Sequence, residues 1–115
     1  MMRLFLATAA VSLAAAASTS AVAAGSPLLV IHHKVADYAK WRPAYDADQP
    51  ARTAAGLTGC QVRPTISDPN DIYIACQMAD VAKAKAFTAA PRLAAKMKGA
   101  GVVGKPEFHF LSAPR

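Results

Sequence analysis

The sequence predicts an α+β fold of the ferredoxin-like type, with a four-stranded antiparallel sheet and two helices on one of its faces. The first observation behind this is the order of the segments after residue 24, which read strand, helix, strand, strand, helix, strand. That order is the βαββαβ plan. The second is the turn Ser67-Asp68-Pro69-Asn70, which is all that separates the two middle strands and makes them an antiparallel hairpin.

Residues 1–24 have the pattern of a cleavable secretory signal peptide and stand outside this fold. Arg3 gives a positive start, and residues 4–17 form an uncharged apolar run that is too short to span a bilayer. Small residues, Ala21-Val22-Ala23-Ala24, end the segment as a signal peptidase requires, which disfavours the alternative of an uncleaved anchor. We therefore expect a periplasmic or secreted protein with no stable membrane insertion after cleavage.

The first half of the remaining domain, residues 25–115, is expected to hold one strand and one helix. Residues 28–35 are β-rich and predict the first strand. Asp37 is a good N-cap, and the helix that it begins is expected to run to Gly56 with a break at 48–50, where Pro50 interrupts it.

The second half is expected to hold three strands and one interrupted helix. Strands are predicted at 57–66 and 71–78, on either side of the turn, and Asp80 is expected to cap the next helix. Pro91 begins a further helical piece that ends near Gly99 and Gly101. The alternation of Phe108 and Phe110 predicts a last strand at 107–111.

The charge of the chain is basic but dispersed. Lys and Arg number 13 against 7 Asp and Glu, a net charge of +6, and no run of like charges occurs. A solvated surface is the simplest interpretation, with attraction to an anionic small molecule or membrane face as the alternative. The absence of aromatic–basic clusters argues against nucleic acid as a partner.

Both predicted helices cover the same sheet face, so the other face needs a cover. We expect that face to carry Ile, Val, Phe and His side chains. A domain of this size has no further element to place there. A second copy of the chain, or a ligand, is therefore expected to lie on it.

Five segments resemble a known family: VADYAKWRPAYD at 35–46, AAGLT at 54–58, DPND at 68–71, KAKAF at 83–87 and AGVV at 100–103. They resemble the dimeric α/β-barrel superfamily, in its antibiotic-biosynthesis-monooxygenase-like and small uncharacterised branches. The resemblance implies a homodimer whose sheets pack face to face, with a pocket between sheet and helices in each subunit. Some members of the superfamily are cofactor-free monooxygenases and some bind or degrade haem. No catalytic signature carries over, so catalytic residues stay unassigned.

Histidines and aromatic residues are the candidates for lining such a pocket. His32 and His33 are adjacent on the first strand and therefore point to opposite sheet faces, and His109 on the last strand can neighbour one of them. A pair of histidines lacks the third ligand that zinc or iron requires, so no metal site and no cofactor are predicted. Two alternatives remain: one His lies in the core or dimer seam and one at the surface, or a His lines the pocket as a hydrogen-bond donor or general base. Aromatic side chains at helical spacing are either core or one wall of a pocket; these are Tyr38, Trp41 and Tyr45.

The two cysteines, Cys60 and Cys76, are candidates for a disulfide, because an exported protein meets an oxidising compartment. They lie on adjacent hairpin strands, and only a register that puts them directly opposite allows the bond. That register pairs Ile66 with Asn70 across the turn. The alternative is two buried thiols that remain unbonded.

These observations predict an exported, dimeric protein that binds a small, partly apolar or anionic molecule. Two other functions remain open at this point. One is a cofactor-free monooxygenase-like enzyme acting on a small aromatic or apolar substrate. The other is a haem-binding protein.

Overall fold

The computed structural model describes residues 25–115, so the predicted signal peptide lies outside the described residues. The elements follow the predicted order, with each predicted helix present as two consecutive helices. They are β1 (Leu28–Val35), α1 (Tyr38–Ala47), α2 (Gln49–Ala54), β2 (Leu57–Pro64), β3 (Asp71–Met78), α3 (Val81–Ala89), α4 (Pro91–Gly99) and β4 (Val102–Leu111).

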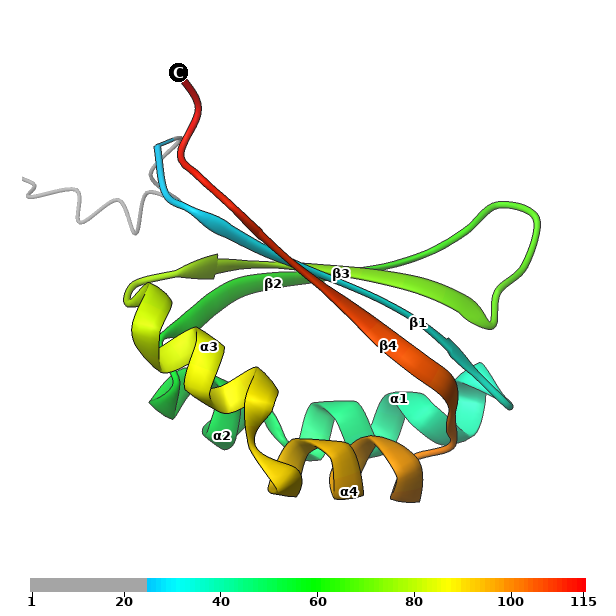
Figure 1. The fold of residues 1–115 in the computed structure, drawn as a ribbon. Coiled ribbons are helices and arrows are strands. Elements are labelled where there is room, and N and C mark those ends of the chain that lie inside the picture. The colour runs from blue at the N-terminus through cyan, green and yellow to red at the C-terminus, as the bar shows by residue number, and fades with distance from the viewer. Residues whose placement is uncertain (1–24) are drawn as a thin grey trace, which may run out of the picture.

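The four strands form one antiparallel sheet in the order β2-β3-β1-β4, and all four helices lie on the same side of it (Figure 1). The predicted ferredoxin-like α+β fold is therefore confirmed. The core lies between the two layers and centres on Leu29, Ile72, Ile74 and Cys76, which are almost completely buried. No helix within residues 25–115 has the length and apolar character needed to cross a membrane.

The helix boundaries follow from caps and prolines. The carboxylate of Asp37 accepts a hydrogen bond from the amide of Ala39, and that of Asp80 accepts one from Lys83, so both predicted N-caps are confirmed. The predicted break in the first helix falls at Asp48, and Pro50 lies in the first turn of α2. Gly56 follows α2 with a φ of +77°, a conformation that favours glycine.

The last strand is longer than predicted, because β4 begins at Val102 instead of residue 107. Val102 and Val103 pair with Val35 and Lys34, and the register then shifts at a β-bulge before His32 pairs with Glu107. The sequence pattern does not predict the first half of β4, because Gly104 and Pro106 are residue types typical of turns. In the β2–β3 hairpin, β2 ends at Pro64 and is thus two residues shorter than the predicted strand 57–66.

The face of the sheet away from the helices, the open sheet face, is more polar than predicted. Phe108 and Phe110 pair with Ile31 and Leu29 and therefore point to the helix side, so the prediction that Phe and Ile side chains lie on the open sheet face is wrong. The open sheet face carries Leu28, Val30 and His32 of β1, Asp71, Tyr73 and Ala75 of β3, and Glu107, His109 and Leu111 of β4.

Candidate functional site

A cavity of about 360 Å³ lies between the helical layer and the sheet. This volume falls in the range of small-molecule sites. Apolar side chains from both layers form most of its wall: Ile31, Trp41, Ile74, Phe87, Leu93 and Met97. Polar side chains at the wall are His33, Tyr45, Asp48, Arg52 and Lys96.

Local structure explains why these side chains meet. Alternation along β1 puts Ile31 and His33 on the helix side of the sheet. Trp41 and Tyr45 are four residues apart on α1 and therefore share the helix face that looks toward the sheet. The predicted pocket-lining positions of His33, Trp41 and Tyr45 thus lie together on the cavity wall.

His33 is a buried, neutral imidazole. Only 4% of its surface is exposed, and its Nδ1 atom has no hydrogen-bond partner within the described chain. Burial is the main cause that lowers the pKa of His33, and the neighbouring His32 charge lowers it further. Its ring meets the edge of Trp41 at 5.5 Å between centroids. A neutral imidazole with one free nitrogen can act as a hydrogen-bond partner or as a general base.

Tyr45 combines an aromatic surface with a polar atom that lacks a partner. Its ring stacks on Trp41 at 4.9 Å, and its hydroxyl is buried without a hydrogen-bond partner in the described residues. Burial is the principal cause that raises the pKa of Tyr45, so the phenol stays protonated and can donate a hydrogen bond.

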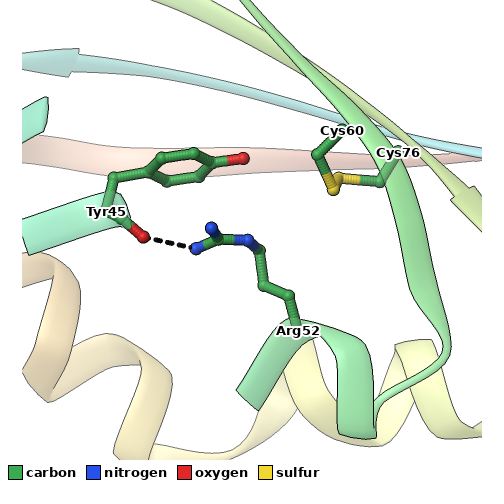
Figure 2. The surroundings of a disulfide bond; sticks show 4 residues. All are labelled: Tyr45, Arg52, Cys60 and Cys76. Carbon is green, nitrogen blue, oxygen red and sulfur yellow. Dashed lines mark hydrogen bonds between the residues drawn. A yellow bond between two sulfur atoms is a disulfide. The ribbon is translucent and has the colours of Figure 1, made fainter. Parts of the chain in front are cut away.

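Arg52 of α2 lies directly under the Tyr45 ring (Figure 2). Its guanidinium carbon is 3.7 Å from the ring centroid, and its Nη1 donates a hydrogen bond of 2.7 Å to the backbone carbonyl of Tyr45. Figure 2 shows the Tyr45 hydroxyl directed toward the disulfide side of the site. Tyr45 and Arg52 also line a second, polar hollow of about 290 Å³, which reaches Arg42, Thr58 and Cys60.

A disulfide joins Cys60 of β2 and Cys76 of β3 in the structure, with 4.1 Å between the Cα atoms. The pairing of Gln61 with Ala75 places Cys60 opposite Cys76, and a β-bulge follows at this point, where Gly59 and Cys60 together oppose Cys76. Gly59 has a φ of +59°, as the first residue of such a bulge commonly does. Pro64 pairs with Ile72 beyond the bulge, which is the register that a pairing of Ile66 with Asn70 implies.

The other predicted pocket residues lie elsewhere. His32 and His109 are on the open sheet face, where His32 Nε2 lies 2.6 Å from Asp71 and Nδ1 lies 3.1 Å from Glu107. His109 approaches the same Glu107 at 3.6 Å. Tyr38 packs against Trp41, and its hydroxyl accepts a hydrogen bond from Arg42 instead of entering the cavity.

The histidines are therefore divided between two faces, as the alternation of His32 and His33 predicts. Within residues 25–115, no group of three or more His, Cys, Asp or Glu side chains is arranged to hold a metal ion. The polar chemistry of the cavity is instead that of a neutral imidazole, a phenol and a guanidinium.

Sequence reasoning missed Arg52. The local spacing pointed the other way, because Asp48 stands four residues before Arg52, and an acid and a base at this spacing pair on a continuous helix. Proline at position 50 ends α1 and starts α2 between them, and Asp48 instead binds Arg92 of α4 at 2.5 Å. Because Asp48 binds Arg92, it does not pair with Arg52, whose side chain lies at the cavity wall.

Comparison with known proteins finds similarity in structure only. No family model and no curated protein matches the sequence, whereas 16 chains of solved structures match. One is a putative antibiotic biosynthesis monooxygenase from Bordetella bronchiseptica, with a TM-score of 0.63 and 16% identity over 75% of this chain and 94% of that one.

Two further matches have stated activities or ligands. SnoaB, a cofactor-independent oxygenase from Streptomyces nogalater, matches with a TM-score of 0.61 and 12% identity, covering 79% of this chain and 95% of its own. The monooxygenase ActVA-Orf6 from Streptomyces coelicolor, in complex with nanaomycin D, matches with a TM-score of 0.54 and 16% identity over 80% and 89%. At these identities the likeness shows the fold alone, and it agrees with the predicted ferredoxin-like α+β fold.

Proposed function

We propose that this chain is an exported protein that binds a small, partly apolar molecule in the cavity between its helices and its sheet. The observation that carries the proposal is the composition of that cavity. Apolar side chains make up most of its wall, and two buried polar atoms, His33 Nδ1 and the Tyr45 hydroxyl, have no partner in the described chain. Buried polar atoms are ordinarily hydrogen-bonded, so a bound molecule with matching groups is the natural complement.

The comparisons support binding by analogy. One structure of the same fold contains the ligand nanaomycin D, and another is described as a putative antibiotic biosynthesis monooxygenase. They support a small organic molecule as the ligand class rather than a macromolecule.

Blocking the cavity tests the proposal. Ala44 lies on the cavity wall but is exposed on α1, so Ala44→Phe is expected to fill space without disturbing the core. Ala39→Phe is the matched control, because Ala39 is exposed on the same helix and does not line the cavity. Mass spectrometry of molecules that co-purify with each protein should detect a ligand with the unmodified chain and with the control, and none with Ala44→Phe. A ligand that persists in Ala44→Phe would contradict the site.

A cofactor-free monooxygenase-like enzyme is the second candidate, and His33 is the observation that favours it. A neutral imidazole in a mostly apolar cavity can take a proton from an acidic phenolic substrate as the first step of oxidation by O₂. Oxygen uptake with a panel of hydroxynaphthalenes, compared between the unmodified protein and His33→Gln, measures this activity. Uptake that is equal in both proteins excludes His33 as the base.

Haem binding is tested by the absorption spectrum, because a Soret band in the purified protein would show bound haem.

We further infer that the open sheet face is covered by a second copy of the chain. Several apolar side chains there are wholly or partly exposed in the single chain, among them Tyr73 at 43% and Leu111 at 47%. Tyr73 pairs with His32 across β3 and β1, and the two rings stack, so this apolar surface adjoins the charged side chains of the same face. Covering a surface of this kind by a copy of itself gives a closed twofold dimer.

Export is the part of the proposal that rests on residues 1–24 alone. N-terminal sequencing of protein from the periplasm or the medium should begin at Ala24 or Gly25. A chain that retains Met1 and stays in the membrane fraction would contradict cleavage.

A further inference from the structure

Arg52 is a buried cation without a carboxylate partner. Only 8% of its surface is exposed. Within residues 25–115, its side chain makes one hydrogen bond, to the neutral carbonyl of Tyr45, and no salt bridge. A guanidinium carries five N–H donors, so most of its capacity is unused.

Such an arrangement is costly unless something balances the charge. A buried charge is stabilised when it is paired and hydrogen-bonded, and it destabilises the fold when it is not. The Tyr45 ring covers one face of the guanidinium and offers a weaker cation–π attraction. Apart from the Nη1 donor that binds the Tyr45 carbonyl, the N–H groups have no partner within residues 25–115, and they lie in the plane of the guanidinium, in which a carboxylate binds.

The other charged side chains at the cavity do not balance Arg52. Asp48 is engaged by Arg92, through Nη2 to Oδ1 at 2.5 Å. Lys96 stands at the wall on α4, is exposed, and adds a second positive charge. Because Arg92 neutralises Asp48, Arg52 and Lys96 leave the cavity wall with a net positive charge.

We propose that the molecule bound in the cavity is an organic carboxylate, with its carboxylate on Arg52 and its apolar body against Ile31, Trp41 and Ile74. This inference rests on the proposed function, because it names the chemical class of the ligand of the same cavity. Because Lys96 is exposed and Arg52 is buried, the interior of the cavity offers one positive charge, which favours a carboxylate over a dianionic phosphate. The planar fork of the guanidinium matches the two oxygens of a carboxylate.

Paired probes test the charge separately from the cavity. Isothermal titration of the purified protein with 2-naphthoate and with 2-naphthamide compares two molecules of nearly equal size, of which only the first is charged. We expect 2-naphthoate to bind about tenfold more tightly or better, as for a hydrogen bond to a charged group. Arg52→Met should abolish that preference while keeping the binding of 2-naphthamide.

Arg63→Met is the matched control, because it removes the same charge from an exposed side chain on the open sheet face. It should keep the preference for 2-naphthoate. Equal binding of both probes to the unmodified protein would overturn the carboxylate inference and leave the proposed function standing. Failure of both probes to bind would count against the cavity as a site and so against both proposals. Loss of both probes in Arg52→Met, with the fold intact by circular dichroism, would assign Arg52 a purely structural role.

Discussion

On the open sheet face, His32 Nε2 lies 2.6 Å from Oδ1 of Asp71. The other ring nitrogen lies 3.1 Å from Oε2 of Glu107, and the ring stacks on Tyr73 with 4.1 Å between centroids. A protonated imidazole can donate to both carboxylates at once. The hydrogen bond with Asp71, followed by that with Glu107, raises the pKa of His32 above 6.5.

This pKa shift predicts that stability depends on pH with a definite sign. Because the folded chain holds the His32 proton more tightly than the unfolded chain, the contribution is complete below pH 6.5 and is lost as the pH rises through the raised pKa. The free energy of unfolding of the unmodified protein should therefore fall relative to His32→Gln as the pH rises above 6.5, by about 1 kcal/mol or less since the cluster meets solvent in the single chain. Urea denaturation across this range measures the difference.

His109→Gln is the control for that series, because His109 shares Glu107 but lies 3.6 Å from it and is more exposed. The lowered pKa of His33 acts in the opposite direction, since its burial costs stability as the pH falls below 6.5. Both proteins contain His33 and share the main cause of its shift, which is burial, so the difference between them reports chiefly His32. A pH-independent difference would contradict the raised pKa.

Reduction of the disulfide should destabilise the protein measurably. The bond spans a sequence separation of 16 residues, and closing a loop of about 15 residues contributes roughly 3 kcal/mol. Urea denaturation with and without dithiothreitol should show a shift of that order, whereas the double variant Cys60→Ala with Cys76→Ala should not respond to the reductant. Two free thiols per denatured, unreduced chain would contradict the bond.

Light scattering should report a dimer that a charge on the open sheet face disrupts. Leu111→Glu places a carboxylate among the exposed apolar residues of that face, where a dimer would bury it unpaired, so it is expected to shift the protein to a monomer at micromolar concentration. Val81→Glu is the control, because Val81 is an exposed apolar residue on α3, in the helical layer. A monomeric unmodified protein, folded by circular dichroism, would contradict the proposed dimer.

Local signals were sufficient to predict the fold and half of the site. Caps such as Asp37 and Asp80 and the hairpin turn act over a few residues, so they can be read directly from the sequence. The alternation of β1 likewise separates His32 from His33. It does not say which of the two faces the helices cover, and that depends on how the whole sheet packs.

The remainder of the site depends on contacts between distant segments. Within residues 25–115, Arg52 has no carboxylate partner, since Asp48, the partner that local spacing offers, binds Arg92, which is 44 residues away in the sequence. The hairpin turn predicts the disulfide register, but the bulge at Gly59 is not predicted, because a sequence pattern cannot distinguish its left-handed conformation from an ordinary strand glycine. Such contacts join residues much further apart than a helical or strand period, so no local pattern predicts them.

Tyr45→Phe separates a role in binding from a role in folding. The Tyr45 hydroxyl is buried without a partner in the described chain, so its removal should leave the ligand-free stability unchanged or raise it by up to about 1 kcal/mol. Trp41→Ala, on the neighbouring turn of α1, should instead cost about 3–5 kcal/mol, because Trp41 is a core side chain with 3% of its surface exposed.

Tyr38→Phe is the matched control for Tyr45→Phe, since the Tyr38 hydroxyl accepts a hydrogen bond from Arg42 outside the cavity. Urea denaturation gives the stabilities, and titration with the co-purifying ligand should show weaker binding for Tyr45→Phe and unchanged binding for Tyr38→Phe. A loss of more than about 1 kcal/mol in ligand-free Tyr45→Phe would mean that the hydroxyl has a structural partner, and its role in the cavity would then be one of folding.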